Sequence, residues 1–309
     1  MLEHAKRATY LVLPAHNSPP ESINSRSHLT DQVEVVPIQP KGSKIPLYLI
    51  HEIFGGTQCY VQLSHALGDD QPLYAFRSFS YYHGRTIEEI AYIYLRHLRA
   101  LDPAGPYLLG GYSFGGLIAF EMARQLYEDG QKTHLVLLFD SWIQGANRRL
   151  RLRELAKIFF RNTRSLGARY AMGKFRDRWR YYEKVTENVL FGLLGSLFER
   201  INLDRPCRIA KAQTEKANRR ALSLYRPGPY EGPVLLMVSG DRQKLISSRG
   251  DPFQGWGILA GKGLDICPIP SDHAAILYEP CVQIVARIIC TRLSRLLNQQ
   301  VELEDDAIT

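Results

Sequence analysis

The sequence predicts an α/β fold in which a mostly parallel central sheet has helices on both faces. Continuous apolar runs such as 47–50 and 135–139 indicate strands that are buried on both sides. Amphipathic stretches such as 87–101 separate these runs, and that alternation is typical of a parallel sheet covered by helices. With 309 residues, 45% of them hydrophobic, the chain can bury a large core. We expect one domain over residues 33–297.

The amino-terminal elements follow a segment without periodicity. Residues 1–32 are rich in Ser, Asn, Pro and His, so we expect a flexible leader or linker there. The run 33–38 alternates weakly and contains a proline, which is tolerated only in an edge strand. Buried strands are expected at 47–50 and 73–76, with a helix between them at 60–67.

The middle of the chain repeats this alternation. Helical periodicity spans 87–101, and Thr86 is its expected N-cap. A buried strand at 107–110 leads into a helix at 117–129, and a further apolar run follows at 135–139. Strands and helices in alternation again predict a parallel sheet.

The pattern changes at about residue 143. Residues 143–213 are helical and basic, which predicts a helical insertion, most simply a lid. Strands are expected again at 234–238 and 264–269, followed by a terminal helix over about 279–297. The tail at 298–309 is polar and is expected to fray.

A six-residue run at 111–116 contains the candidate nucleophile. Its sequence is Gly-Tyr-Ser-Phe-Gly-Gly, and it places Ser113 between the expected strand at 107–110 and the expected helix at 117–129. This is the G-x-S-x-G pattern of the nucleophile elbow in α/β-hydrolases, where a sharp turn lifts the serine Oγ clear of the sheet. A side chain at either flanking glycine would crowd so tight a turn.

An acyl-transfer enzyme also needs two backbone N–H groups directed at the developing oxyanion. The residue after the nucleophile supplies one of them, here Phe114, and the loop after an early strand supplies the other. That loop lies at 51–56, and its two glycines allow it to bend close to a substrate. We expect the second donor to be the N–H of Ile53, with the N–H of Phe54 as the alternative.

A serine nucleophile requires a base to take its proton and an acid to orient that base. His273 fits the base because it lies in the loop after the last expected strand. Asp140 and Asp241 each follow a buried strand, at the edge of the sheet where ligands bind in such folds. Asp272 is adjacent to the histidine and is expected to point elsewhere. Spacing alone leaves Asp140 and Asp241 as alternatives for the acid.

Composition argues against several classes of protein. The net charge is +8, but without a recognised nucleic-acid motif or interleaved aromatic and basic residues we expect no nucleic-acid binding. No run of about 18 apolar residues is present, so no membrane span is expected, and a cytoplasmic enzyme is the simplest inference. The five cysteines are scattered without metal-ligand spacing, so we expect reduced thiols and no metal.

Residues 34–295 resemble the type I thioesterase domain that ends many non-ribosomal peptide synthetases and polyketide synthases. The similar pieces are 36–42, 46–56, 110–121, 137–141, 225–227 and 270–273. The resemblance implies an α/β-hydrolase fold, a lid in the place of 143–213, an oxyanion N–H at Ile53 and Asp140 as the acid. One departure is Glu52 after His51, where members often have His-Pro, and it leaves the path of this loop open.

The resemblance also implies a function. An acyl or peptidyl chain would arrive as a thioester on the phosphopantetheine arm of a carrier protein domain, and no cofactor would be bound directly. Ser113, deprotonated by His273, would take the acyl group and release it by hydrolysis or macrocyclisation. A freestanding editing thioesterase or a serine esterase or lipase is the alternative, and a non-catalytic binding protein is the rival from another class. Carrier domains are typically acidic, so Arg148, Arg149 and Arg151 are expected to speed docking.

Overall fold

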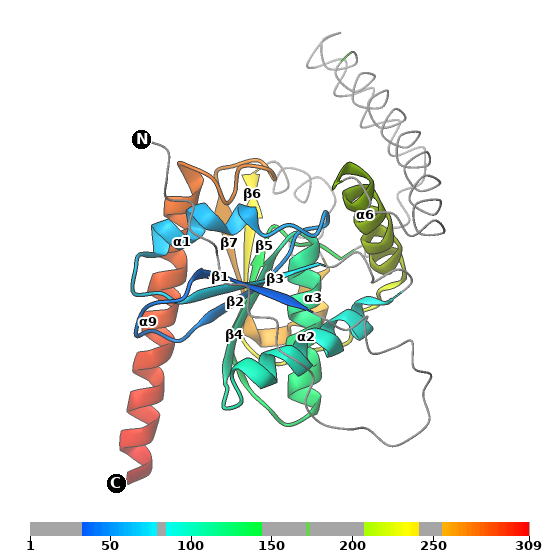
Figure 1. Ribbon diagram of the computed structural model, residues 1–309. Helices are drawn as coiled ribbons and strands as arrows, with labels where there is room; N and C mark the ends of the chain where they lie inside the picture. Colours follow the sequence, from blue (N-terminus) through cyan, green and yellow to red (C-terminus); the bar gives the residue numbers. More distant parts are fainter. Residues whose placement is uncertain (1–32, 79–84, 144–171, 173–206, 241–254, 309) are drawn as a thin grey trace.

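The computed structural model describes most of the expected domain (Figure 1). The residues it describes are 33–78, 85–143, 172, 207–240 and 255–308. The leader expected at 1–32 and most of the lid expected at 143–213 lie outside these residues.

The described strands form one sheet in the order β1-β3-β2-β4-β5-β6-β7. Their bounds are β1 (Glu34–Gln39), β2 (Leu47–Ile50), β3 (Leu73–Arg77), β4 (Tyr107–Tyr112), β5 (Thr133–Phe139), β6 (Val234–Ser239) and β7 (Leu264–Ile269). Only β1 pairs antiparallel to its neighbour, and the other pairs described are parallel. The mostly parallel sheet is therefore confirmed, and Pro37 lies in the edge strand β1 as expected.

Two hydrophobic clusters fill the two faces of this sheet. The α-helices of the described residues are α1 (Val61–Leu67), α2 (Ile87–Leu101), α3 (Phe114–Glu128), α6 (Cys207–Leu224), α8 (Trp256–Leu259) and α9 (Cys281–Ile308). Side chains of α2, α3, α6 and α8 pack in one cluster, and those of α1 and α9 pack in the other. Figure 1 shows these two groups on opposite sides of the strands.

Helix α2 shows why the sequence pattern translates into structure. The Thr86 hydroxyl accepts the Glu89 N–H at 3.3 Å, and the Glu89 carboxylate accepts the Thr86 N–H at 2.7 Å. This capping box satisfies two amide groups that a helix start would leave unpaired. The apolar stripe of Ile90, Tyr94 and Leu98 is buried, so both the N-cap and the buried face are confirmed.

Two helix ends differ from expectation. The expected fraying of 298–309 is wrong for 298–308, because α9 continues to Ile308. This segment contains Gln, Glu, Leu and Ala but no glycine or proline, so local propensity does not stop the helix. Helix α6 begins inside the expected insertion and runs beyond residue 213 to Leu224. The short helix α8 was not anticipated from the sequence.

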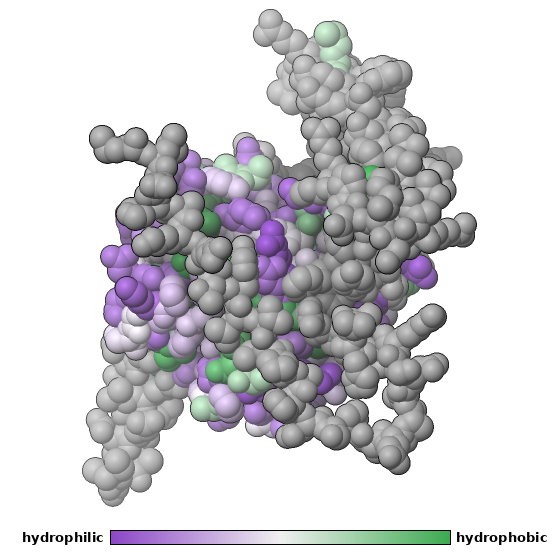
Figure 2. All heavy atoms as spheres, in the orientation of Figure 1, coloured by the Kyte–Doolittle hydropathy of each residue, from purple (hydrophilic) through white to green (hydrophobic). Residues whose placement is uncertain are grey.

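The surface of the described part is mixed. Figure 2 shows mainly hydrophilic residues on the visible face, with small hydrophobic areas between them. None of the helices in the described ranges is both long and apolar enough to cross a bilayer.

Candidate active site

Three strands bring the expected chemical groups to one edge of the sheet. Ser113 follows β4, Asp140 follows β5, and His273 lies in the loop after β7. Strands β4, β5, β6 and β7 run parallel, so their carboxyl ends lie at the same edge. That edge is where ligands bind in open α/β sheets.

The turn at Ser113 has the geometry of a nucleophile elbow. Ser113 adopts φ 55° and ψ −108° and is the N-cap of α3, while its N–H donates to the Phe139 carbonyl at 2.9 Å. A Cβ on Gly111 would lie 2.2 Å from the carbonyl carbon of Gly115, and a Cβ on Gly115 would lie 2.3 Å from the Ile50 oxygen. Both flanking glycines are therefore required by close backbone contacts, as the sequence predicted.

Asp140 holds the imidazole of His273. One carboxylate oxygen, Oδ2, lies 2.5 Å from His273 Nδ1. The same carboxylate accepts the backbone N–H and the hydroxyl of Ser239, each at 2.9 Å. Asp140 is fully buried, so these three partners replace the water that its charge loses. Ser239, at the end of β6, is a site residue that the sequence did not reveal.

The backbone of Asp140 is strained in the same way as that of Ser113. Asp140 adopts φ 49°, and among the described residues these two are the non-glycine positions with positive φ. Such conformations persist only where the surrounding structure imposes them, and they are frequent at functional sites.

The structure describes only one of the other two carboxylates near the candidate base. Asp241 lies outside the described residues. Asp272 accepts the N–H of Ala275 at 2.7 Å through Oδ1, so its carboxylate caps the following turn. The carboxylate that contacts His273 is therefore that of Asp140.

Aromatic rings fix the position of His273. The ring of Tyr112 stacks on the imidazole with centroids 4.9 Å apart, and its hydroxyl donates to the His273 carbonyl at 2.7 Å. Trp142 packs edge-on against the imidazole, with the ring centroids 5.6 Å apart. Sequence reasoning missed both rings, although Tyr112 could have been suspected because it directly precedes Ser113.

A buried tyrosine joins the two loops that frame the serine. The Tyr60 hydroxyl donates to the Ile50 carbonyl at 2.5 Å and accepts the Tyr112 N–H at 2.8 Å. Ile50 and Tyr112 end β2 and β4, so Tyr60 bridges these strands just before the 51–56 loop and the elbow begin. This bridge sets the spacing between the expected oxyanion loop and the nucleophile.

His51 has a structural place in this loop. Its ring is fully buried, and Nδ1 donates to the Glu52 carbonyl at 2.7 Å. Burial lowers the pKa of His51 to about 4, so the ring is neutral near pH 7. Tyr94 packs edge-on against the His51 ring, with the ring centroids 5.9 Å apart.

The structure bears on the candidate oxyanion donors Phe114 and Phe54. Phe114 opens α3, and the first N–H groups of a helix have no partner within the helix. The N–H of Phe54, the alternative to Ile53, donates to the Glu52 carboxylate at 2.8 Å and is engaged. The choice of Ile53 stays a prediction at this point.

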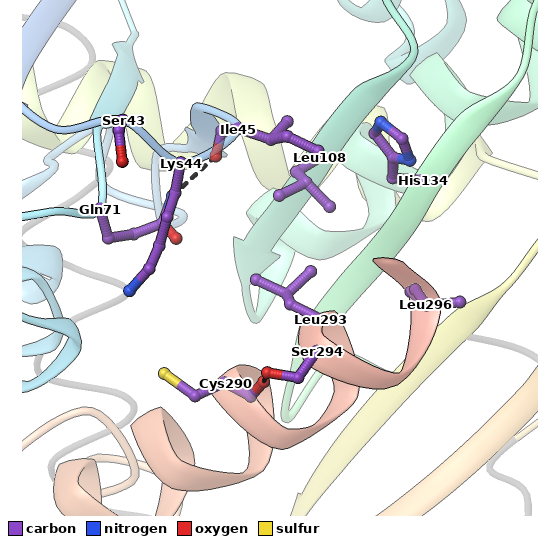
Figure 3. Close-up of a pocket in the computed structure, with 10 residues that line it drawn as sticks. All are labelled: Ser43, Lys44, Ile45, Gln71, Leu108, His134, Cys290, Leu293, Ser294 and Leu296. Atoms are coloured by element: carbon purple, nitrogen blue, oxygen red, sulfur yellow. Dashed lines mark hydrogen bonds between the residues drawn. The ribbon is translucent and has the colours of Figure 1, made fainter. Parts of the chain in front are cut away.

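A cavity of about 370 Å³ lies away from this edge (Figure 3). Leu108 and His134, near the amino ends of β4 and β5, face Leu293 of α9 across it. The cavity is therefore at the opposite edge of the sheet, and the candidate catalytic residues do not line it.

The expectations for the cysteines, for metal ligands and for the basic residues concern the rest of the chain. Cys59, Cys267, Cys281 and Cys290 are free thiols, as predicted. The described residues contain no cluster of His, Cys, Asp and Glu suited to a metal ion. The basic residues Arg148, Arg149 and Arg151 lie outside the described ranges, so their expected role in docking remains a prediction.

Comparison with known proteins agrees with this geometry. The thioesterase domain family matches residues 45–293. The nonribosomal peptide synthetase atqA of Aspergillus terreus is 41% identical over 113 residues, which cover 35% of this chain and 11% of that protein. Malpinin synthetase of Mortierella alpina is 38% identical over 111 residues, which cover 35% of this chain and 1% of that protein. The chain thus spans 11% or less of the length of these two curated relatives.

Solved structures extend the similarity over most of the chain. The NocB thioesterase domain, in covalent complex with a fluorophosphonate nocardicin G analogue, is 25% identical with a TM-score of 0.58. That match covers 84% of this chain and 99% of the NocB chain. A four-domain nonribosomal peptide synthetase bound to AMP and glycine is 28% identical with a TM-score of 0.60, covering 82% of this chain and 20% of its own.

Proposed function

Because the chain belongs to the thioesterase domain family, we propose that it releases an acyl or peptidyl chain from the phosphopantetheine thioester of a carrier protein domain. The observation that supports this most strongly is the 2.5 Å contact between Asp140 and His273 beside the elbow at Ser113. A serine served by an imidazole that a carboxylate orients is the arrangement that activates a hydroxyl for acyl transfer.

In the proposed acylation step, the Ser113 Oγ attacks the thioester carbonyl carbon and its proton passes to His273. The Asp140 carboxylate accepts a hydrogen bond from Nδ1–H of the ring, so the proton stays on Nδ1, and it stabilises the imidazolium that forms. The N–H groups of Ile53 and Phe114 would bind the oxyanion, assisted by the amino end of α3. The carbon–sulfur bond then breaks, and the thiol leaves with the proton from His273.

The acyl-serine would then be opened by a second nucleophile. His273 accepts a proton from water, which gives a free acid, or from an amine or hydroxyl of the chain itself, which gives a macrocycle. The bond between the acyl carbon and Ser113 Oγ then breaks, and His273 returns the proton to Oγ. Exclusion of water from the acyl-enzyme would favour the second route. Removal of one oxyanion donor in comparable sites costs roughly 10²–10³ in kcat.

The proposed partner is an acyl or peptidyl carrier domain. Support comes from the relatives, which are named as peptide synthetases, and from the match to part of a four-domain synthetase. In this proposal the phosphopantetheine arm belongs to the substrate, and the protein itself holds no cofactor. We place the reaction in the cytoplasm, where carrier-bound chains are assembled.

A synthetic acyl-pantetheine with an internal amine tests the proposal. Mass spectrometry should detect free acid, macrocycle or both, and the matching simple oxygen ester should be cleaved more slowly. A fluorophosphonate should label Ser113 in the native protein and leave the Ser113→Ala variant unlabelled. Faster cleavage of simple esters would point instead to an esterase, and absence of labelling would contradict a serine mechanism.

A further inference from the structure

The loop after β2 has almost all of its amide groups engaged. The N–H of Glu52 donates to the Gly56 carbonyl at 3.2 Å, and the N–H of Gly55 donates to the Glu52 carbonyl at 2.8 Å. The N–H of Thr57 donates to the side chain of Gln58 at 3.2 Å. A backbone N–H that no protein group accepts is available to a ligand or to solvent, so the donor that remains in this loop is of interest.

The Glu52 side chain takes two more of these donors. Its Oε2 accepts the N–H of Phe54 at 2.8 Å, and its Oε1 accepts the N–H of Gly56 at 3.2 Å. Within the part of the chain that the structure describes, the N–H of Ile53 is then the one amide between residues 52 and 57 without an acceptor.

The peptide that contains the Ile53 N–H is fixed at its other end. The Glu52 carbonyl, which is antiparallel to that N–H in a trans peptide, accepts from Gly55 and from His51 Nδ1. The Ile53 carbonyl in turn accepts from Asn218 Nδ2 at 2.9 Å. Asn218 is buried in α6, so a helix far along the sequence also holds this loop.

The loop faces the start of the nucleophile helix. A Cβ on Gly115 would lie 2.3 Å from the Ile50 oxygen and 2.5 Å from the His51 oxygen, so the two backbones are in contact. A donor held on this loop is therefore close to Ser113, two residues before Gly115. Burial raises the pKa of Glu52, and the two bound N–H groups and Lys211 of α6 oppose that rise.

We propose that Glu52 is a positioning residue for the oxyanion site: its carboxylate binds the N–H groups of Phe54 and Gly56 and leaves the N–H of Ile53 as the loop's donor to substrate. Asn218 acts with it by holding the Ile53 carbonyl. This inference rests on the proposed thioesterase function. It assigns a specific use to the glutamate that stands where a proline is common in similar domains.

Glu52→Gln tests the inference with little change in shape. The amide retains one acceptor oxygen but presents an NH₂ group to a backbone N–H, so the loop should shift. We expect kcat for an acyl-pantetheine to fall on the order of tenfold to a hundredfold, with KM unchanged, because misplacement by 1 Å can cost about 10²-fold. The rate of fluorophosphonate labelling at Ser113 should fall in parallel.

Glu89→Gln is the matched control, because Glu89 also accepts a backbone N–H but lies in the capping box of α2. The Glu89→Gln variant should have a lower free energy of unfolding and an unchanged kcat. Asn218→Ala provides a second route if the Glu52 variant folds poorly, and it should lower kcat with KM unchanged.

The outcomes separate the inference from the function. Normal kcat in Glu52→Gln and Asn218→Ala, or a rise in KM with kcat unchanged, would overturn the positioning role. If the native protein neither turns over the thioester nor reacts with the fluorophosphonate, the proposed function fails, and the inference fails with it.

Discussion

At the scale of single residues, the site depends on backbone positions that ordinary side chains rarely adopt. Ser113 and Asp140 both have positive φ, and the first of them lies on a turn with no room for a side chain at Gly111. Strain of this kind costs on the order of 1–3 kcal/mol per residue and must be supported by surrounding contacts. Here the support comes from backbone packing at the elbow and from hydrogen bonds to the Asp140 carboxylate.

Gly111→Ala should disrupt the elbow. The new Cβ would lie 2.2 Å from the backbone of Gly115, and no side-chain rotation can relieve that contact. We expect a loss of about 3 kcal/mol in the free energy of unfolding, together with loss of fluorophosphonate labelling. Gly240→Ala is the control, since its nearest neighbour would be 3.5 Å away. Equal stability of the two variants in urea would contradict this account.

Asp140→Asn should remove most of the activity. The amide cannot stabilise an imidazolium, and it favours the wrong tautomer of His273, so we expect kcat to fall about 10⁴-fold. Asp272→Asn changes the adjacent carboxylate, which caps a turn at Ala275, and should keep most of the activity. Steady-state kinetics with an acyl-pantetheine measure both variants. Comparable losses would mean that Asp140 is not the acid.

At the scale of elements, one polar cluster joins α3 to the segment after α6. Glu121 of α3 is buried, and Arg124 contacts its two carboxylate oxygens at 2.7 and 2.9 Å. The Tyr225 hydroxyl donates to the same carboxylate at 2.9 Å. Because α3 begins directly after Ser113 and α6 holds the 51–56 loop through Asn218, this cluster fixes both helices relative to the candidate site.

Arg124→Met should destabilise the fold strongly. It leaves the Glu121 charge buried with only hydroxyl and amide partners, which typically costs about 3–5 kcal/mol. Arg99→Met is the control, because its ion pair with Asp129 is largely exposed and is expected to contribute less than about 1 kcal/mol. Urea unfolding of both variants measures the difference. A cost below 1 kcal/mol for Arg124→Met would show that the Glu121 carboxylate does not remain buried and unpaired in the variant.

At the scale of the whole molecule, the two edges of the sheet in this α/β-hydrolase fold differ. The carboxyl ends of the strands hold the candidate catalytic groups, while the 370 Å³ cavity lies near the amino ends. Two separate clusters of apolar residues cover the two faces. The imidazole of His51 is fully buried, and it makes the stability of the molecule depend on pH.

The protein should lose stability as the pH falls from 6.5 to 4. The pKa of His51 is about 4 in the folded protein, against 6.5 for an unperturbed histidine, so in this window the unfolded chain binds more protons and is favoured. The loss amounts to about 3 kcal/mol. The pKa of Glu52 is raised on folding, so its protonation offsets part of this loss.

Urea unfolding at several pH values tests this dependence. His51→Asn retains a donor for the Glu52 carbonyl but has no ring to protonate, so its free energy of unfolding should fall less between pH 6.5 and 4. Parallel curves for the variant and the native protein would contradict the assignment.

The sequence alone determined the order of most elements and the place of the elbow that contains the candidate nucleophile. The runs at 47–50 and 135–139, the N-cap at Thr86 and the glycines around Ser113 are signals between near neighbours, and local periodicity encodes such signals. The helix beyond residue 298 was missed because a polar composition does not by itself stop a helix.

Tertiary structure decided which distant groups meet. Spacing left Asp140 and Asp241 open, and only the folded sheet brings the Asp140 carboxylate to His273, 133 residues away in the chain. The stacking of Tyr112 on His273 and the bond from Asn218 to Ile53 join residues 161 and 165 positions apart. No local pattern specifies such contacts, because they arise from the packing of whole strands and helices.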